Sequence, residues 1–62
     1  MIHIDLTGPK GNAFALLAMA HGWAKDLGLD WYEIRDKATS GDYENLVSVL
    51  ENTFGEYVSF DR

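Results

Sequence analysis

The chain changes from a strand pattern to a helix pattern within one short run, Asp5-Leu6-Thr7-Gly8-Pro9-Lys10-Gly11-Asn12. Up to this run, Ile2, Ile4 and Leu6 alternate with polar residues, which is the period-2 pattern of a half-buried strand. The glycines and the proline of the run end the strand, and Asn12 is a suitable N-cap for a following helix. We therefore expect a tight strand-to-helix turn here.

Three helix patterns follow the turn. The first covers residues 13–27, is apolar over most of its circumference and ends before Gly28, which suits a left-handed C′ position. A short second helix is expected after Asp30, and Ser40 or Asp42 is expected to cap a third helix that ends at a glycine. The third helix has the clearest amphipathic pattern, carried by Tyr43, Leu46, Val47, Leu50 and Phe54. Because the first helix is apolar on more than one side, we expect a partner to cover part of it.

A second short strand is expected over residues 57–60, so the fold class is α+β with the order β-α-α-α-β. If the two long helices form an antiparallel hairpin, the terminal strands also run antiparallel. They then pair into a two-stranded antiparallel sheet packed on the helical hairpin. Such a lone pair is marginal in water, so a second copy is expected to extend it to four strands across a dimer.

The composition limits the class of protein. Residues 1–62 form one domain, and 47% of the residues are hydrophobic, which is too apolar for a disordered chain. Cysteine is absent, which excludes disulfides and thiolate metal sites, so a homodimer is the expected source of extra stability. The net charge of −5 argues against nucleic-acid binding. No membrane-spanning run or signal-peptide pattern is present, and we expect a cytoplasmic protein without a membrane partner.

The turn is the first candidate site. Lys10 and the free N–H groups of the first helical turn could hold a phosphate or a carboxylate. The ligand-binding candidates are Gly8, Lys10, Gly11 and Asn12. The Walker and dinucleotide-binding patterns are missing, and the Gly-x-x-Gly loop of KH domains joins two helices rather than following a strand. A purely structural turn is the alternative interpretation.

The two histidines, His3 and His21, could form a metal site or a general base together with Asp5. Their spacing fits no compact ligand motif, and no Ser-His or Cys-His pair can be assembled. We therefore expect both to be surface residues, with no metal, no cofactor and no enzymatic activity.

Two surfaces are candidates for protein contact. One is the exposed strand face and the other is a group of aromatic residues around the end of the first helix, although the aromatic residues could instead form core. The candidate residues are His3, Asp5, Trp23, Trp31, Tyr32 and Tyr57. The ten acidic residues are spread along the chain, which is typical of a solvated surface rather than a mimic of nucleic-acid phosphates.

Two blocks resemble small uncharacterised proteins encoded by tailed bacteriophages. One block is Met1-Ile2-His3-Ile4-Asp5-Leu6-Thr7-Gly8-Pro9-Lys10-Gly11-Asn12-Ala13-Phe14, and the other runs from Ser40-Gly41-Asp42-Tyr43-Glu44 to Phe54-Gly55-Glu56-Tyr57-Val58. The resemblance covers about half of the chain and leaves the middle unmatched. It implies a shared fold and expression inside an infected bacterium, but no activity and no residue role.

The sequence thus favours a small non-enzymatic phage interaction protein that binds and modulates a host or phage protein. One version is an inhibitor of a host enzyme or of a defence system. The alternative is a small anionic-ligand or nucleotide binder that uses the turn at residues 8–12.

Overall fold

The structure, a computed structural model, describes residues 2–62, and its elements follow the predicted order. They are β1 (Ile2–Asp5), the 3-10 turn η1 (Pro9–Gly11), α1 (Ala13–Leu27), α2 (Trp31–Ala38), α3 (Tyr43–Phe54) and β2 (Val58–Asp61). The α+β class is therefore confirmed. In the part of the chain that is described, no helix combines the length and the apolar character needed to cross a membrane.

The helices begin and end where the sequence indicates. The side chains of Asn12, Asp30 and Asp42 each accept a hydrogen bond from a backbone N–H in the first turn of the helix they precede. These bonds satisfy donors that a helix leaves unpaired at its N-terminus. Gly28 ends α1 with a φ of 71°, a left-handed conformation that is easy for glycine alone. Of the two candidate caps for α3, Asp42 takes the position, while Ser40 donates its hydroxyl to a carbonyl of α2.

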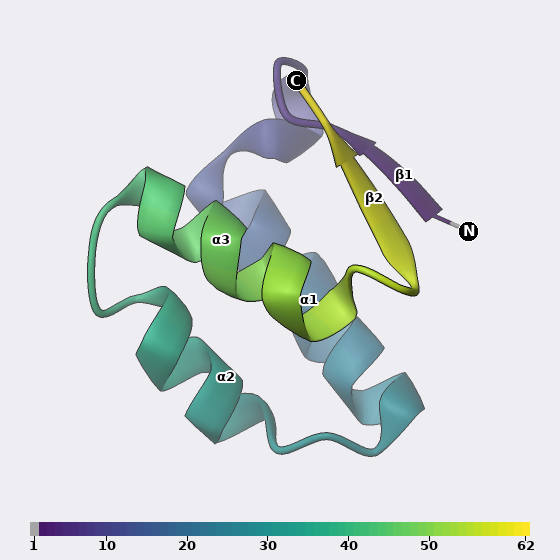
Figure 1. Cartoon of the computed structure of the whole chain (residues 1–62), viewed down its shortest axis with the longest axis vertical. Helices are drawn as coiled ribbons and strands as arrows, with labels where there is room; N and C mark the ends of the chain where they lie inside the picture. The colour runs from purple at the N-terminus through teal and green to yellow at the C-terminus, as the bar shows by residue number, and fades with distance from the viewer. Residues whose placement is uncertain (1) are drawn as a thin grey trace.

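The two strands pair in parallel, with Ile2 opposite Val58 and Ile4 opposite Phe60. The antiparallel pairing predicted from the sequence is therefore wrong. That prediction treated the two long helices as a hairpin and the segment between them as a connection. In the structure the chain reverses its direction before and after α2, so α1 and α3 run in the same direction (Figure 1). The chain therefore reverses its direction an even number of times between β1 and β2, and the two strands are parallel.

The half-buried pattern predicted for Ile2, Ile4 and Leu6 is confirmed, and the second strand buries residues on the same face. Ile4 and Val58 are buried, and Ile2, Leu6 and Phe60 are partly buried against the same core. Residues of the two strands that alternate with these point to the other face, because successive side chains of a strand lie on opposite sides. The sheet is thus apolar inside and polar outside.

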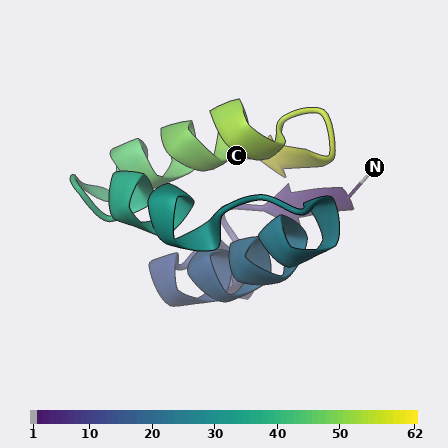
Figure 2. The ribbon, with the colours of Figure 1, turned by 90° about the horizontal axis from the view of Figure 1, so that it is seen from below.

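The core lies between α1 and α3, with α2 closing one side and the sheet closing the other (Figures 1 and 2). All of the buried side chains within residues 2–62 are hydrophobic. The largest fully buried ones are Phe54, Leu16, Leu50, Val47 and Val58. Each of the three helices and each strand contributes at least one residue to this core, so one hydrophobic cluster holds the whole chain together.

Candidate functional site

The turn at residues 8–12 is held by its own hydrogen bonds. Asn12 Oδ1 accepts from the N–H of Ala15 at 2.8 Å, and Asn12 Nδ2 donates to the carbonyl of Pro9 at 2.7 Å. The N–H of Gly11 donates to the carbonyl of Gly8 at 3.0 Å. The amide group of Asn12 is therefore engaged at both ends by the backbone next to it.

Gly11 is required by close packing. A Cβ atom at this position would lie 2.0 Å from the carbonyl oxygen of Leu6, a distance that no side chain can accept. The carbonyl of Gly11 also accepts a hydrogen bond from the hydroxyl of Tyr43, which ties the turn to the start of α3. The glycine that suggested a ligand loop in the sequence thus lets the turn pack against the end of β1.

The electrostatics of the turn disfavour an anion. The hydroxyl and the N–H of Thr7 donate to Asp5 Oδ1 at 2.6 and 2.9 Å, and these bonds lower the pKa of Asp5. The ionised carboxylate and Lys10 line the same hollow, about 330 Å³ in volume, together with His3. A phosphate beside Lys10 would face a like charge at Asp5. Anion binding here stays a prediction, and a structural turn accounts for the geometry.

The two histidines lie on different surfaces. His3 is exposed on the polar face of the sheet, with Nδ1 3.7 Å from Asp61 Oδ2. His21 is exposed on α1 and stacks on Trp31, with 5.0 Å between the ring centroids and 9° between the planes. Within residues 2–62, no three His, Cys, Asp or Glu side chains are grouped so that they could hold a metal ion.

The three aromatic residues predicted to cluster have separate environments. Trp23 is only 7% exposed and meets Phe54 and Phe60 edge-on, with centroid distances of 5.5 and 6.0 Å. Its prediction as part of a contact surface is therefore wrong, because edge-to-face packing against two core rings buries it. Trp31 is half-buried under His21, and Tyr32 is 68% exposed. These two remain available at the surface.

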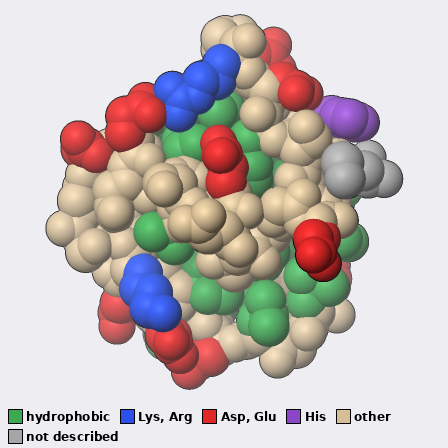
Figure 3. Space-filling model, in the orientation of Figure 1, with side chains coloured by type: hydrophobic (Ala, Val, Ile, Leu, Met, Phe, Trp, Pro, Cys, Tyr) green, Lys and Arg blue, Asp and Glu red, His purple; other side chains and the backbone are tan. Residues whose placement is uncertain are grey.

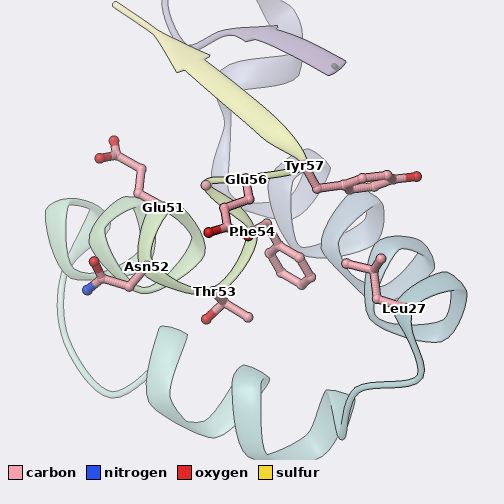
Figure 4. Close-up of a pocket in the computed structure, with 8 residues that line it drawn as sticks. Leu27, Glu51, Asn52, Thr53, Phe54, Glu56 and Tyr57 are labelled. Carbon is pink, nitrogen blue, oxygen red and sulfur yellow. The ribbon is translucent and has the colours of Figure 1, made fainter.

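Tyr57 borders a hollow of about 670 Å³ near the ends of α1 and α3 (Figure 4). Leu27 and Tyr57 lie on one side of it, and Phe54 forms part of its wall. Glu51 and Glu56 supply its charged groups. Its lining combines the carboxylates of Glu51 and Glu56 and the hydroxyl of Thr53 with apolar groups.

Some of the charged side chains on the surface form ion pairs. Arg62 donates through both terminal nitrogens to the carboxylate of Glu44 at 2.8 Å each, and Lys37 Nζ lies 3.1 Å from Glu33 Oε1. The hydrogen bond with Arg62 lowers the pKa of Glu44. Figure 3 shows acidic side chains scattered over the visible face rather than gathered on it. In each of these two pairs the opposite charges lie within hydrogen-bond distance of each other.

An exposed apolar strip runs along the side of α1 that faces away from the core. We call it the outer face of α1, and it consists of Phe14, Ala15, Ala18 and Gly22. Phe14 is 85% exposed, Ala18 and Gly22 are exposed, and Ala15 is half-buried. Phe14, Ala18 and Gly22 are four residues apart, so they follow one another along a single line on the helix.

Phe14 is the residue that the sequence prediction did not single out. It was placed on a side of the helix expected to be covered, without being named as a contact residue. Its position nearly opposite the buried Leu16 is the signal that could have marked it, since each residue turns the helix by about 100° and two residues turn it by about 200°.

Comparisons with protein-family models, with curated proteins and with solved structures each found no match. The resemblance of the two end blocks to phage proteins stays a prediction. Function is inferred below from the surfaces just described.

Proposed function

We propose that this chain is a small non-enzymatic protein that acts by binding another protein through the outer face of α1. The exposure of Phe14 carries the proposal, because 85% of this large apolar residue is left in water. Burying such a side chain contributes about 1.5–3 kcal/mol. An apolar residue next to other apolar residues is a stronger indication of an interface than an isolated one.

The shape of the outer face supports a specific kind of partner. A Cβ atom added to Gly22 would meet nothing within 4 Å, so no other part of the chain covers the helix there. Ala18 adds only a methyl group. The helix surface at Ala18 and Gly22 is therefore formed by small residues, and the Phe14 ring projects from one end of it. A partner that offers an apolar pocket for the ring and a helix to lie along this surface would match it, since small side chains let helices approach closely.

The setting of this contact comes from the phage resemblance. It favours a host or phage protein as the partner, inside the cytoplasm of an infected bacterium. The chain would then modulate that protein by occupying its surface, as an inhibitor of a host enzyme or of a defence system does. The paired surface charges and the hydrophobic core are consistent with a role that depends on contact rather than chemistry.

The test compares two exposed aromatic positions. Immobilised wild-type protein, Phe14→Glu and Tyr32→Glu are incubated with bacterial lysate, and the retained proteins are identified by mass spectrometry. Both replaced residues are exposed, so both variants should keep the wild-type circular dichroism spectrum. We expect wild type and Tyr32→Glu to retain the same protein and Phe14→Glu to lose it. Retention by Phe14→Glu at the wild-type level, or retention of nothing by wild type, would contradict the proposal.

A further inference from the structure

Within residues 2–62, the outer edge of β1 pairs with no other strand. Of the polar groups on this edge, the carbonyl of Asp5 accepts one hydrogen bond, from the N–H of Gly8 at 3.2 Å, and keeps a second lone pair for another donor. The N–H groups of Ile2 and Leu6 donate to the carbonyls of Tyr57 and Asp61 at 3.2 and 2.7 Å, so this side of β1 belongs to β2. Successive N–H groups of a strand point to opposite sides, and those of His3 and Asp5 therefore point away from β2. In the two-stranded sheet of residues 2–62, no strand meets them.

There is room beside this part of the strand. The hollow of about 330 Å³ is lined by His3, Ile4 and Asp5 on one side and by Gly8, Pro9 and Lys10 on the other. The segment that follows β1 thus contacts the strand at Asp5, through the N–H of Gly8, and lies across this hollow from the rest of it. An open strand edge of this kind is a template for another strand.

The sequence of β1 is complementary to itself about its centre. In Ile2-His3-Ile4-Asp5-Leu6, a basic residue and an acidic residue flank Ile4, and an apolar residue follows on each side. Reading the strand in the opposite direction gives the same pattern with His and Asp exchanged. Two copies related by a two-fold axis through Ile4 would therefore place an imidazole, whose ring N–H can donate a hydrogen bond, beside a carboxylate, which accepts one, at both ends of the pair.

We propose that β1 pairs antiparallel with β1 of a second copy, with Ile4 opposite Ile4 and His3 opposite Asp5 of the second copy. This gives a four-stranded sheet in the order β2-β1-β1-β2. The contact is made by the same surface of both chains, as a two-fold dimer requires. It lies on a different element from the outer face of α1 and does not rest on the function proposed above.

The register follows from hydrogen bonding and charge together. Only the odd-numbered residues of β1 offer N–H groups on the outer edge, so they must form the hydrogen-bonded pairs of the new ladder. Shifting the register by one such pair in either direction puts His3 opposite His3, or Asp5 opposite Asp5. Two carboxylates directly opposite each other repel, and two imidazoles opposite each other lack the carboxylate acceptor that Asp5 offers to the ring N–H of His3. The register centred on Ile4 is the one that pairs His3 with Asp5.

The apolar face of the sheet gains from the same register. Ile2 and Leu6 are only partly buried in the single chain. Pairing about Ile4 places Ile2 of one chain opposite Leu6 of the other on the inner face. The two cores are then joined along the sheet, and the lone two-stranded pair, which is marginal in water, becomes part of a larger one.

The first experiment is sedimentation equilibrium of the wild-type chain and of His3→Pro at micromolar concentration. Proline removes the outward N–H of residue 3 and is tolerated where that N–H faces solvent, so the ladder between β1 and β2 is kept. We expect a dimer for wild type, a monomer for His3→Pro, and a weaker dimer for His3→Ala, which keeps the N–H. Slow hydrogen exchange of the Ile4 N–H in all three proteins would verify that β1 still pairs with β2. A monomeric wild type, or an undiminished dimer in His3→Pro, would overturn the proposal.

The second experiment tests the register by cross-linking, which is direct because the chain has no cysteine. Opposite residues of a hydrogen-bonded antiparallel pair have Cα atoms about 5.5 Å apart, within the range that a disulfide spans. We expect His3→Cys mixed with differently tagged Asp5→Cys to form mixed disulfide dimers on mild oxidation. Each variant alone should form few. Cross-linking of either variant with itself as readily as in the mixture would contradict this register.

Discussion

The two faces of α1 are both apolar, but only one of them belongs to the core. On the inner face, Leu16, Ala20 and Ala24 are fully buried under the rest of the fold. On the outer face, Phe14 is 85% exposed although it lies only two residues before Leu16. The difference does not come from the side chains themselves. It comes from which elements reach each face: within residues 2–62, the other elements pack against the inner face and leave Phe14 in water.

The largest expected effect is a difference in the free energy of unfolding between a variant of the inner face and a variant of the outer face. Leu16→Ala should lower the free energy of unfolding by about 2–5 kcal/mol, because it removes buried methyl groups and leaves a cavity. Phe14→Ala should change it by less than about 0.5 kcal/mol, because the ring is already in water. Urea denaturation of the two variants measures both values. A loss at Phe14 comparable with that at Leu16 would mean that the outer face is covered within the folded chain.

A smaller effect on stability is expected when alanine replaces a closely packed glycine, Gly11, or a glycine on the outer face, Gly22. Gly11→Ala should destabilise the protein by about 1–3 kcal/mol, because the new Cβ would overlap the Leu6 carbonyl and force the backbone to move. Gly22→Ala is the matched control on the outer face, where the added methyl group meets nothing within 4 Å. Alanine is the better helix former by about 0.8–1.0 kcal/mol, so this variant should be more stable than wild type. Thermal denaturation would show shifts of opposite sign, and equal shifts would contradict the packing described for Gly11.

The smallest expected effect is a pH dependence that involves neither face of α1. The hydrogen bond from Arg62 holds the pKa of Glu44 below its ordinary value of 4.5 in the folded state. A carboxyl whose pKa is lowered by folding contributes stability above its unfolded pKa and loses it as the pH falls through the folded value. Wild type should therefore have a slightly higher Tm than Glu44→Gln at neutral pH, and the difference should vanish in acid. A difference that does not change with pH would show that the pair with Arg62 does not stabilise the fold.

The helices could be predicted because their signals are local. Asn12, Asp30 and Asp42 are polar caps placed directly before helical patterns, and the structure uses all three. Gly28 ends α1 because only a residue without a side chain adopts its backbone conformation easily. These features depend on a few neighbouring residues, so the sequence carries them fully.

The strand direction could not be predicted in the same way, because it depends on the path of the whole chain. Eight residues from Trp31 to Ala38 form α2. If they are treated as a connection rather than as a helix that runs back along the fold, the number of chain reversals between the two strands becomes odd, and the strands are predicted to be antiparallel. The candidate site shows the same limit. Periodicity places Phe14 and Leu16 on different sides of α1, but it does not say which side the other elements cover. For the same reason the sequence allows Trp23 to belong either to a contact surface or to the core. Its contacts with Phe54 and Phe60 place it in the core.

The most direct test of the proposed contact surface is fluorine NMR of the protein labelled with fluorophenylalanine. The chain has three phenylalanines, of which Phe14 is exposed, Phe54 is buried and Phe60 is partly buried. Spectra are compared in buffer and in bacterial lysate, with each resonance assigned by substitution. We predict that the Phe14 resonance shifts or broadens selectively in lysate while the Phe54 resonance does not. If all three resonances stay unchanged, or all broaden to the same extent, the outer face of α1 is not the binding surface.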